Sequence, residues 1–164
     1  MGLAAGMSLS ACCEALSQAQ ATAGRQQIAH TSAGVTVMDD AYNANPDSMR
    51  ASLATFAALA ADGRHIAVLG DMGELGDFAP ECHERVGRMA ADANLDLLMC
   101  VGDLSTHIAR SAREAGMDDA AVIHFDTVSE ALDALCAQVS DGDAVLVKAS
   151  HFMEFDAIVK GLVD

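Results

Sequence analysis

The sequence alternates short apolar segments with segments of helical periodicity, and this alternation constrains the fold more than any other feature. Five apolar runs have the length of a strand and are nearly continuous, which is typical of strands buried on both faces of a sheet. They occupy residues 35–38, 66–69, 97–101, 121–125 and 144–147. Helical patterns lie between and after them, at residues 48–61, 80–93, 105–115, 128–139 and 154–163.

Strands that alternate with helices favour right-handed crossovers and a parallel sheet. We therefore predict an α/β fold of the Rossmann-like, doubly wound type, with a mostly parallel sheet of about six strands and helices on both faces. The sixth strand is expected within residues 26–31, joined to the next strand by the short turn Ser32-Ala33-Gly34. A connection this short makes the strand antiparallel to its neighbour.

An excess of acidic residues narrows the classes of partner. The chain has 24 acidic and 9 basic residues, for a formal net charge of −15. Nucleic acids and anionic membrane surfaces attract a basic face, so we expect neither as a partner and interpret the acids as a solubilising surface. We also find no signal peptide and no segment of membrane-spanning length, which favours a cytoplasmic protein without membrane insertion.

The cysteines and histidines do not have the spacing of a metal site. The five cysteines form neither a zinc pattern nor a Cys-x-x-Cys pair, and the six histidines are scattered. Cys100 lies in an apolar run and Cys136 on the apolar side of a helical pattern, so both are predicted to be buried, reduced thiols. We predict no metal site.

Hydrogen-bonding side chains crowd the turn between the run at 35–38 and the helical pattern after it. The turn reads Asp39-Asp40-Ala41-Tyr42-Asn43-Ala44-Asn45-Pro46-Asp47-Ser48. In open α/β sheets ligands bind at the carboxyl ends of the strands, and these residue types suit a ribose, a base edge or a short peptide. A polar loop with a helix N-cap explains the same residues without a ligand.

A phosphate-binding loop is absent from the sequence. Nothing matches Gly-x-x-x-x-Gly-Lys-[Ser/Thr], and Lys148 and Lys160 are the two lysines of the chain. Gly70, Gly73 and Gly76 do not have the spacing of the dinucleotide fingerprint. We therefore predict that this chain by itself does not turn over ATP.

Three segments resemble the C-terminal domain of the Mur ligase family. The first is Asp-Asp-x-Tyr-Asn-Ala-Asn-Pro-x-Ser-Met from Asp39, and the second is Leu-Gly-Asp-Met-x-Glu-Leu-Gly from Leu69. The third, from Val147, reads Val-Lys-Ala-Ser-His where the family pattern has Val-Lys-Gly-Ser-Arg, so Ala149 and His151 depart from it. Their order and spacing fit nearly the whole chain.

The type that the chain resembles adds D-alanyl-D-alanine to a UDP-N-acetylmuramoyl-tripeptide in peptidoglycan precursor synthesis. The resemblance implies that residues 1–24 are the helical end of a central ATPase domain and that residues 25–164 are the C-terminal domain. Such a ligase activates a carboxylate as an acyl phosphate, which the amine of the dipeptide attacks. ATP and Mg²⁺ would be held mainly by the central domain, and the chain's own N-terminal and central domains would be its partners.

The resemblance also implies roles for individual residues. The proposed catalytic residue is Arg25, which would reach toward the terminal phosphate. Nucleotide contacts would come from Asp40, which would accept a hydrogen bond from the ribose, and from Tyr42, Asn43 and Asn45. Dipeptide contacts would come from Asp71, Glu74, Lys148 and Ser150. Because a carboxylate at a strand end is expected outside the core, replacing Asp40 should hardly change folding.

Two other classes of protein fit parts of the pattern. A receiver domain that accepts a phosphoryl group has acids, a hydroxyl and a lysine after successive strands, here Asp39, Asp40, Asp103, Thr127 and Lys148. That interpretation leaves residues 42–46 unexplained, and Asp40 lies far from Asp103 in the sequence. A bare nucleotide-binding module is the second alternative.

Overall fold

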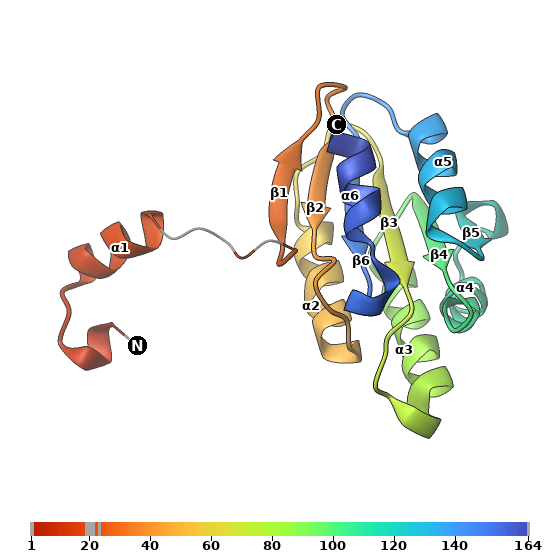
Figure 1. Ribbon diagram of the computed structural model, residues 1–164, viewed down its shortest axis with the longest axis horizontal. Helices are drawn as coiled ribbons and strands as arrows, with labels where there is room; N and C mark the ends of the chain where they lie inside the picture. The colour runs from red at the N-terminus through yellow and green to blue at the C-terminus, as the bar shows by residue number, and fades with distance from the viewer. Residues whose placement is uncertain (1, 19–21, 23, 164) are drawn as a thin grey trace.

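A six-stranded sheet forms the centre of the protein in a computed structural model that describes residues 2–18, 22 and 24–163 (Figure 1). The strand order is β1-β2-β6-β3-β4-β5. The strands are β1 (Gln27–His30), β2 (Thr36–Asp39), β3 (His65–Gly70), β4 (Leu97–Val101), β5 (Val122–Phe125) and β6 (Ala144–Lys148). β1 is antiparallel to β2, and the other neighbours are parallel, which confirms the predicted sheet.

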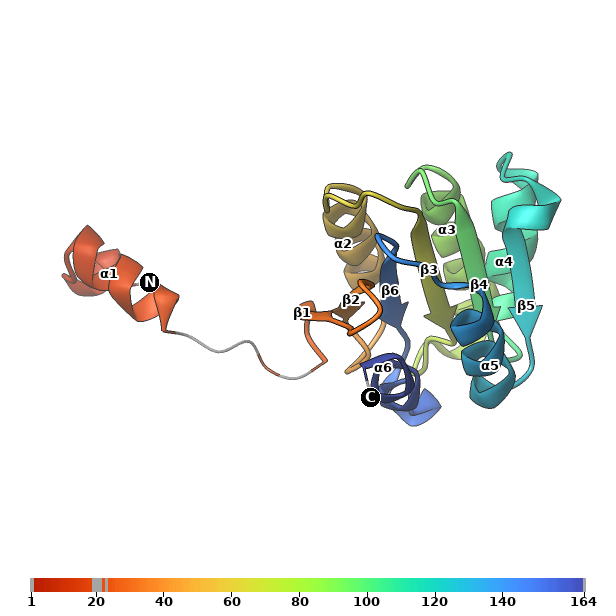
Figure 2. The same cartoon turned by 90° about the horizontal axis from the view of Figure 1, so that it is seen from above.

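Helices cover both faces of the sheet, as Figure 2 shows from above. α2 (Pro46–Ala57), α3 (Ala79–Ala91) and α4 (Ser105–Glu114) lie on one face, while α5 (Val128–Gln138) and α6 (Asp156–Val163) lie on the other. Short 3₁₀ turns are formed by η2 (Gly76–Phe78), η3 (Asp119–Ala121) and η4 (His151–Met153). The doubly wound α/β architecture expected from the alternating pattern is therefore confirmed.

The strands supply both cores because their successive side chains point to opposite faces. Met38, Leu69 and Cys100 belong to the core beneath α2, α3 and α4. Val37 and Val147 belong to the core beneath α5 and α6. This two-sided burial is the reason that the strands appear in the sequence as continuous apolar runs.

Side-chain caps fix where two of the helices begin. Asn45 accepts a hydrogen bond from the Ser48 amide at the start of α2, and the Ser48 hydroxyl accepts from the Asn45 amide in return. Thr127 and Glu130 form the same reciprocal capping box at the start of α5. Each cap satisfies backbone N–H groups that a helix leaves without partners at its first turn.

The N-terminal segment lies away from the sheet in Figures 1 and 2. It contains η1 (Leu3–Ala5) and α1 (Leu9–Ser17), and no residue of either element is buried. Residues 3–5 and 9–17 of this segment are therefore helical, while residues 1, 19–21 and 23 lie outside the described residues. Its assignment to a preceding domain stays a prediction.

The cysteine prediction was right at one position and wrong at another. Cys100 is completely buried in β4. Cys136 is exposed, because the buried side of α5 is formed by Ala131 and Leu135 instead. The predicted helix is present as α5, but its buried face is narrower than the set of apolar residues in the helical pattern, which included Cys136.

Candidate functional site

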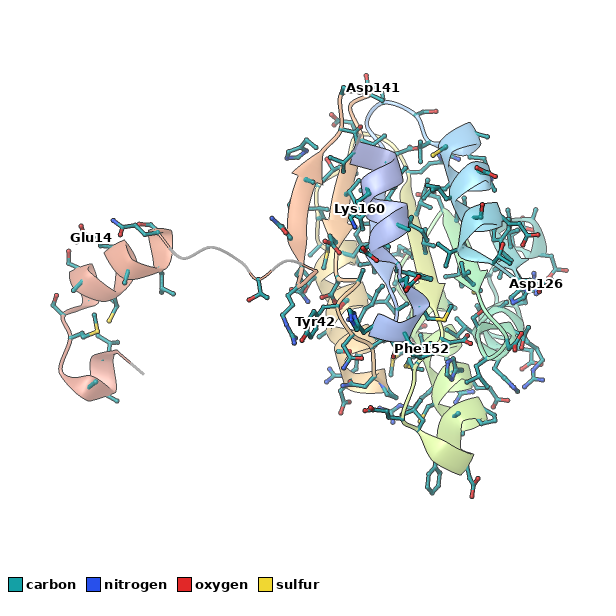
Figure 3. All side chains as sticks on the ribbon, in the orientation of Figure 1. Glu14, Tyr42, Asp126, Asp141, Phe152 and Lys160 are labelled. Carbon is teal, nitrogen blue, oxygen red and sulfur yellow. The ribbon has the colours of Figure 1, made fainter. Side chains whose placement is uncertain are left out.

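The strand order brings together the ends of three strands that are far apart in the sequence. β6 lies between β2 and β3, so Asp40, Lys148 and Asp71 follow neighbouring strands at one edge of the sheet. Lys148 bonds Asp40 directly although 108 positions separate them in the chain. Figure 3 shows Tyr42 and Phe152 at this same end of the molecule, opposite Asp141. The carboxyl ends of the strands therefore form the candidate site.

Asp40 lies inside a buried network. Lys148 Nζ is 2.7 Å from Asp40 Oδ2, and Lys148 is 1% exposed. The Ser52 hydroxyl of α2 donates to the same carboxylate oxygen, and the Gln26 amide donates to Oδ1 over 3.2 Å. Lys148 also donates to the Asn43 carbonyl over 2.8 Å. The expectation that the Asp40 carboxylate lies outside the core is therefore wrong, because Asp40 is buried and pairs with a buried ammonium group.

A pocket of about 370 Å³ adjoins this network. Residues of the 39–48 turn and the chain just before β1 line it together with the buried pair. The lining includes Arg25, Asp40, Tyr42, Asn43, Asn45, Ser48 and Lys148. The structure thus gathers Arg25 and all four residues predicted to contact the nucleotide around one space.

Two flat groups contact the ring of Tyr42, which lines this pocket. The Arg25 guanidinium lies 4.2 Å from the centre of the Tyr42 ring, which is a cation–π contact. The His151 ring also contacts Tyr42, tilted by 33° with 5.8 Å between ring centroids. Gly24 makes this possible, because its φ is +70° and a Cβ there would lie 3.0 Å from the Tyr42 amide nitrogen. Tyr42 is 47% exposed, so part of its surface remains open to a ligand.

A second pocket, of about 500 Å³, lies on the other side of the 42–45 turn. The loop after β3 forms one wall, with Gly73, Glu74 and Leu75. Ser150 contributes its hydroxyl, which accepts from the Gly73 amide over 2.9 Å and donates to the Ala44 carbonyl over 3.2 Å. Glu74 is exposed at this pocket and has a φ of +61°. Two of the four predicted dipeptide residues, Glu74 and Ser150, are therefore brought together here.

Lys148 and Asp71 do not line this second pocket. Lys148 faces the first one. The Asp71 carboxylate accepts from the backbone amides of Leu104 and Ser105, at 3.2 and 2.7 Å, and so caps the start of α4. Gly102 leaves room for it, since a Cβ there would lie 2.8 Å from that carboxylate. Asp71 is buried and its observed contacts are those of a helix cap.

Sequence reasoning missed His83, which is completely buried on α3. Its Nε2 accepts from the Met72 amide over 2.9 Å, and its Nδ1 bonds the Ala79 carbonyl over 2.7 Å. Burial lowers its pKa more than the hydrogen bond to Ala79 and the charge of Asp71 raise it. In the sequence, His83 is a single histidine in a helical pattern that also contains Val86 and Ala90. That pattern indicates a buried position, but it does not indicate that the ring bonds the Met72 amide of a distant loop.

The receiver alternative is excluded by the sheet order. β6 and β3 separate the end of β2 from the end of β4, so Asp40 and Asp103 follow strands about 14 Å apart. Two acids that share a metal ion must lie much closer together. Thr127, the hydroxyl of that interpretation, is a helix cap.

Metal-binding clusters and membrane-spanning helices are both absent from the described residues. None of their His, Cys, Asp and Glu side chains gather in groups of three or more that could hold a metal ion. None of their helices is both long enough and apolar enough to cross a membrane.

Comparison with known proteins gives a consistent result. Residues 24–151 match the family described as "Mur ligase, glutamate ligase domain". UDP-N-acetylmuramoyl-tripeptide–D-alanyl-D-alanine ligase of Bacillus subtilis is 34% identical over 149 residues, which cover 91% of this chain and 32% of that protein. The enzyme of the same name from Mycobacterium tuberculosis strain CDC 1551 is 41% identical over 157 residues, covering 85% of this chain and 31% of that protein.

A solved structure agrees with these relatives. A crystal structure of MurF from Acinetobacter baumannii superimposes with a TM-score of 0.82 at 31% identity, covering 99% of this chain and 35% of that one. The chain therefore spans about a third of the length of the curated relatives that it matches.

Proposed function

Because this chain belongs to the Mur ligase family, through a match to its glutamate ligase domain, we propose that it is the C-terminal domain of an ATP-dependent carbon–nitrogen ligase. The reaction proposed is the addition of D-alanyl-D-alanine to a UDP-N-acetylmuramoyl-tripeptide, a step in peptidoglycan precursor synthesis. The named relatives above support the choice of substrates. A cytoplasmic location is part of the proposal.

The observation that carries the proposal is that one short turn separates two pockets. Tyr42, Asn43 and Asn45 line both the pocket of about 370 Å³ and the pocket of about 500 Å³. A ligase that joins a phosphorylated acid to an amine must hold a nucleotide and an amine substrate in a fixed relation, because most of its rate gain comes from positioning. A turn bonded to Lys148 at the end of β6 and to Ser150 just after it can supply that relation.

In this proposal the pocket that contains Arg25 faces the nucleotide. Arg25 is exposed beside the Tyr42 ring, so its guanidinium can neutralise charge on a transferring phosphoryl group. Asp40 lines the same pocket and keeps lone pairs that can accept from a ribose hydroxyl, although Lys148 already bonds it. Asn43 and Asn45 supply polar groups around the base and ribose.

The pocket that contains Ser150 and Glu74 would hold D-alanyl-D-alanine. An ammonium group at the amino end of the dipeptide would pair with the exposed Glu74 carboxylate, and backbone amides or the Ser150 hydroxyl would contact its polar groups. Phe152, which is 63% exposed at this pocket, offers an apolar surface to a methyl side chain. Asp71, just after β3, and Lys148, at the end of β6, would then act indirectly, because Asp71 bonds the start of α4 and Lys148 bonds the Asn43 carbonyl.

ATP and Mg²⁺ are proposed to be held mainly by a central domain, with the UDP-linked substrate bound by that domain and an N-terminal one. This matches the family pattern, in which the C-terminal domain closes over a nucleotide that another domain binds. When bound there, Mg²⁺ would offset the phosphate charge during transfer. The residues of this chain would supply orientation and a positive charge from Arg25.

The test compares the complete protein that carries this chain with the 164-residue chain alone. The complete protein is expected to release phosphate from ATP only when the UDP-linked tripeptide and D-alanyl-D-alanine are both present. The chain alone is expected to release none, since it lacks a phosphate-binding loop. Phosphate release by the chain alone, after contaminating ATPases are excluded, or a preference of the complete protein for a single amino acid over the dipeptide, would contradict the proposal.

A further inference from the structure

His83 connects α3 to the loop that follows β3. The Met72 amide donates to His83 Nε2 over 2.9 Å, and the ring bonds the Ala79 carbonyl through Nδ1 over 2.7 Å. A ring nitrogen that accepts from an N–H carries no proton, so the proton of the neutral imidazole lies on Nδ1 and is donated to Ala79. His83 is completely buried, so water cannot replace either hydrogen bond without an opening of the structure.

Gly73, the next residue of the loop, connects the loop to Ser150, which follows β6. The Gly73 amide donates to the Ser150 hydroxyl, which donates in turn to the Ala44 carbonyl of the turn between the two pockets. The Ser150 amide donates to the Asp71 carbonyl over 3.0 Å. The wall of the pocket of about 500 Å³ is therefore held by His83 on one side and by Ser150 on the other.

We propose that His83 is a positioning residue that holds the Met72–Leu75 wall of the dipeptide pocket in place only while its imidazole is neutral. The identity of the ligand rests on the function proposed above, whereas the contact between His83 and the loop does not. Protonation of Nε2 would turn the acceptor into a donor that faces the Met72 N–H. The loop would then have to move, and it would take Gly73 and Glu74 with it.

Burial, and then the groups around His83, set the pH at which this change occurs. Asp71, on the loop after β3, raises its pKa, while His107 on α4 lowers it. His107 itself lies beside Glu84 and Arg110. Burial has the largest effect and lowers the pKa of His83 below its ordinary value of 6.5. The pocket wall should therefore be ordered at neutral pH and be released in mildly acidic solution.

Two variants separate the hydrogen bond from the charge. In His83→Gln the amide oxygen can accept from Met72 without titrating, so this variant should keep the loop in place at every pH. In His83→Leu the buried Met72 amide loses its partner, so the loop should be released even at neutral pH. Amide exchange of the ¹⁵N-labelled 164-residue chain reports on this directly, through the protection factors of Met72 and Gly73.

For the wild-type chain, protection of Met72 and Gly73 should fall at least tenfold between pH 7 and pH 5 relative to β4 amides, and His83→Gln should abolish this fall. Protection that follows β4 in the wild type, or an equal fall in His83→Gln, would overturn the proposal. This measurement needs no substrate, so its outcome does not depend on whether the proposed function is right.

In the complete ligase, His83→Leu should raise KM for D-alanyl-D-alanine about tenfold at pH 7.5, and His83→Gln should stay near the wild type. KM for ATP should remain unchanged in both, because the nucleotide pocket does not include the 72–75 loop. An equal rise in both KM values would assign His83 a general structural role and overturn the proposal. A ligase that ignores the dipeptide altogether would instead contradict the proposed function, while the exchange data still decide the role of His83.

Discussion

Replacing Asp40 with alanine should destabilise the domain strongly. The substitution leaves the Lys148 ammonium, which is 1% exposed, with the Asn43 carbonyl as its remaining observed partner. It also removes the acceptor of the Gln26 amide and one of two acceptors of the Ser52 hydroxyl, which also bonds the Ser48 carbonyl over 2.8 Å. Breaking a buried pair by removing one partner costs about 3–5 kcal/mol. For a domain of this size that corresponds to a fall in Tm of roughly 10–15 °C.

A double-mutant cycle isolates the charge pair from the loss of volume. Lys148→Met alone leaves Asp40 bonded to Ser52 and Gln26, so we expect it to cost less than Asp40→Ala. In the double variant Asp40→Ala/Lys148→Met no buried charge remains, so the two effects should fall short of additivity by about 2–3 kcal/mol. Urea denaturation followed by circular dichroism gives the free energies of unfolding and shows, through the m-values, whether unfolding stays two-state.

Asp40→Asn keeps the volume and one oxygen that can accept from Lys148 and Ser52, but it removes the negative charge and places an NH2 group opposite the Gln26 amide, so its cost should lie between wild type and Asp40→Ala. In the complete ligase it should preserve most of the folded protein while changing KM for ATP, if Asp40 also contacts the ribose. A stability of Asp40→Ala within about 0.5 kcal/mol of wild type, the range of ordinary surface changes, would refute the reasoning from burial.

Three further predictions follow from other contacts. Arg25→Ala in the complete ligase should lower kcat even at saturating ATP without lowering Tm, because Arg25 is exposed; an unchanged kcat would remove its proposed catalytic role. Burial raises the pKa of Asp143, but the hydrogen bonds from Arg64 and Ser140 together with the Arg64 charge lower it more, so the net pKa lies below the ordinary value of 3.8. Its contribution to stability should therefore be present above pH 3.8 and be lost as the pH falls through the lowered pKa of the folded state. Asp143→Asn should flatten that part of the stability curve measured by urea titration between pH 5 and pH 3. Burial raises the pKa of the Cys100 thiol, so under native conditions a thiol reagent should label Cys136 rapidly and Cys100 only on unfolding, which mass spectrometry of the labelled peptides would show.

The fold was predictable because its main determinant is local in the sequence. The run at 97–101 forms β4 with the same bounds. It is apolar throughout because helices cover both faces of this strand, so neither face carries polar side chains. The short turn after residue 31 likewise indicated the antiparallel β1. Helix ends depended on caps, and α2 begins two residues before the predicted start because Pro46 follows the Asn45 cap.

The partners of the site residues could not be predicted in the same way. The sequence indicates that Asp40, Asp71 and Lys148 follow strands, but it does not indicate which strands are neighbours. Only the insertion of β6 beside β2 decides that Lys148 pairs with Asp40 and leaves Asp71 to cap α4. Burial of Asp40 accompanies that pairing, so the expectation of a carboxylate outside the core was wrong for a non-local reason.

The position of β6 has a consequence for how the chain folds. β6 is the sixth of the described strands along the chain, yet it lies in the middle of the sheet, between β2 and β3. Until it is in place, β1 and β2 form one ribbon and β3, β4 and β5 form another, each with an open edge. During synthesis the two halves therefore cannot join before residues 144–148 have left the ribosome. A pause before that point would expose two unpaired strand edges that are prone to aggregation. Since contacts so distant in sequence form slowly, we expect refolding to be limited by the arrival of this strand, with both pockets appearing only in that last step.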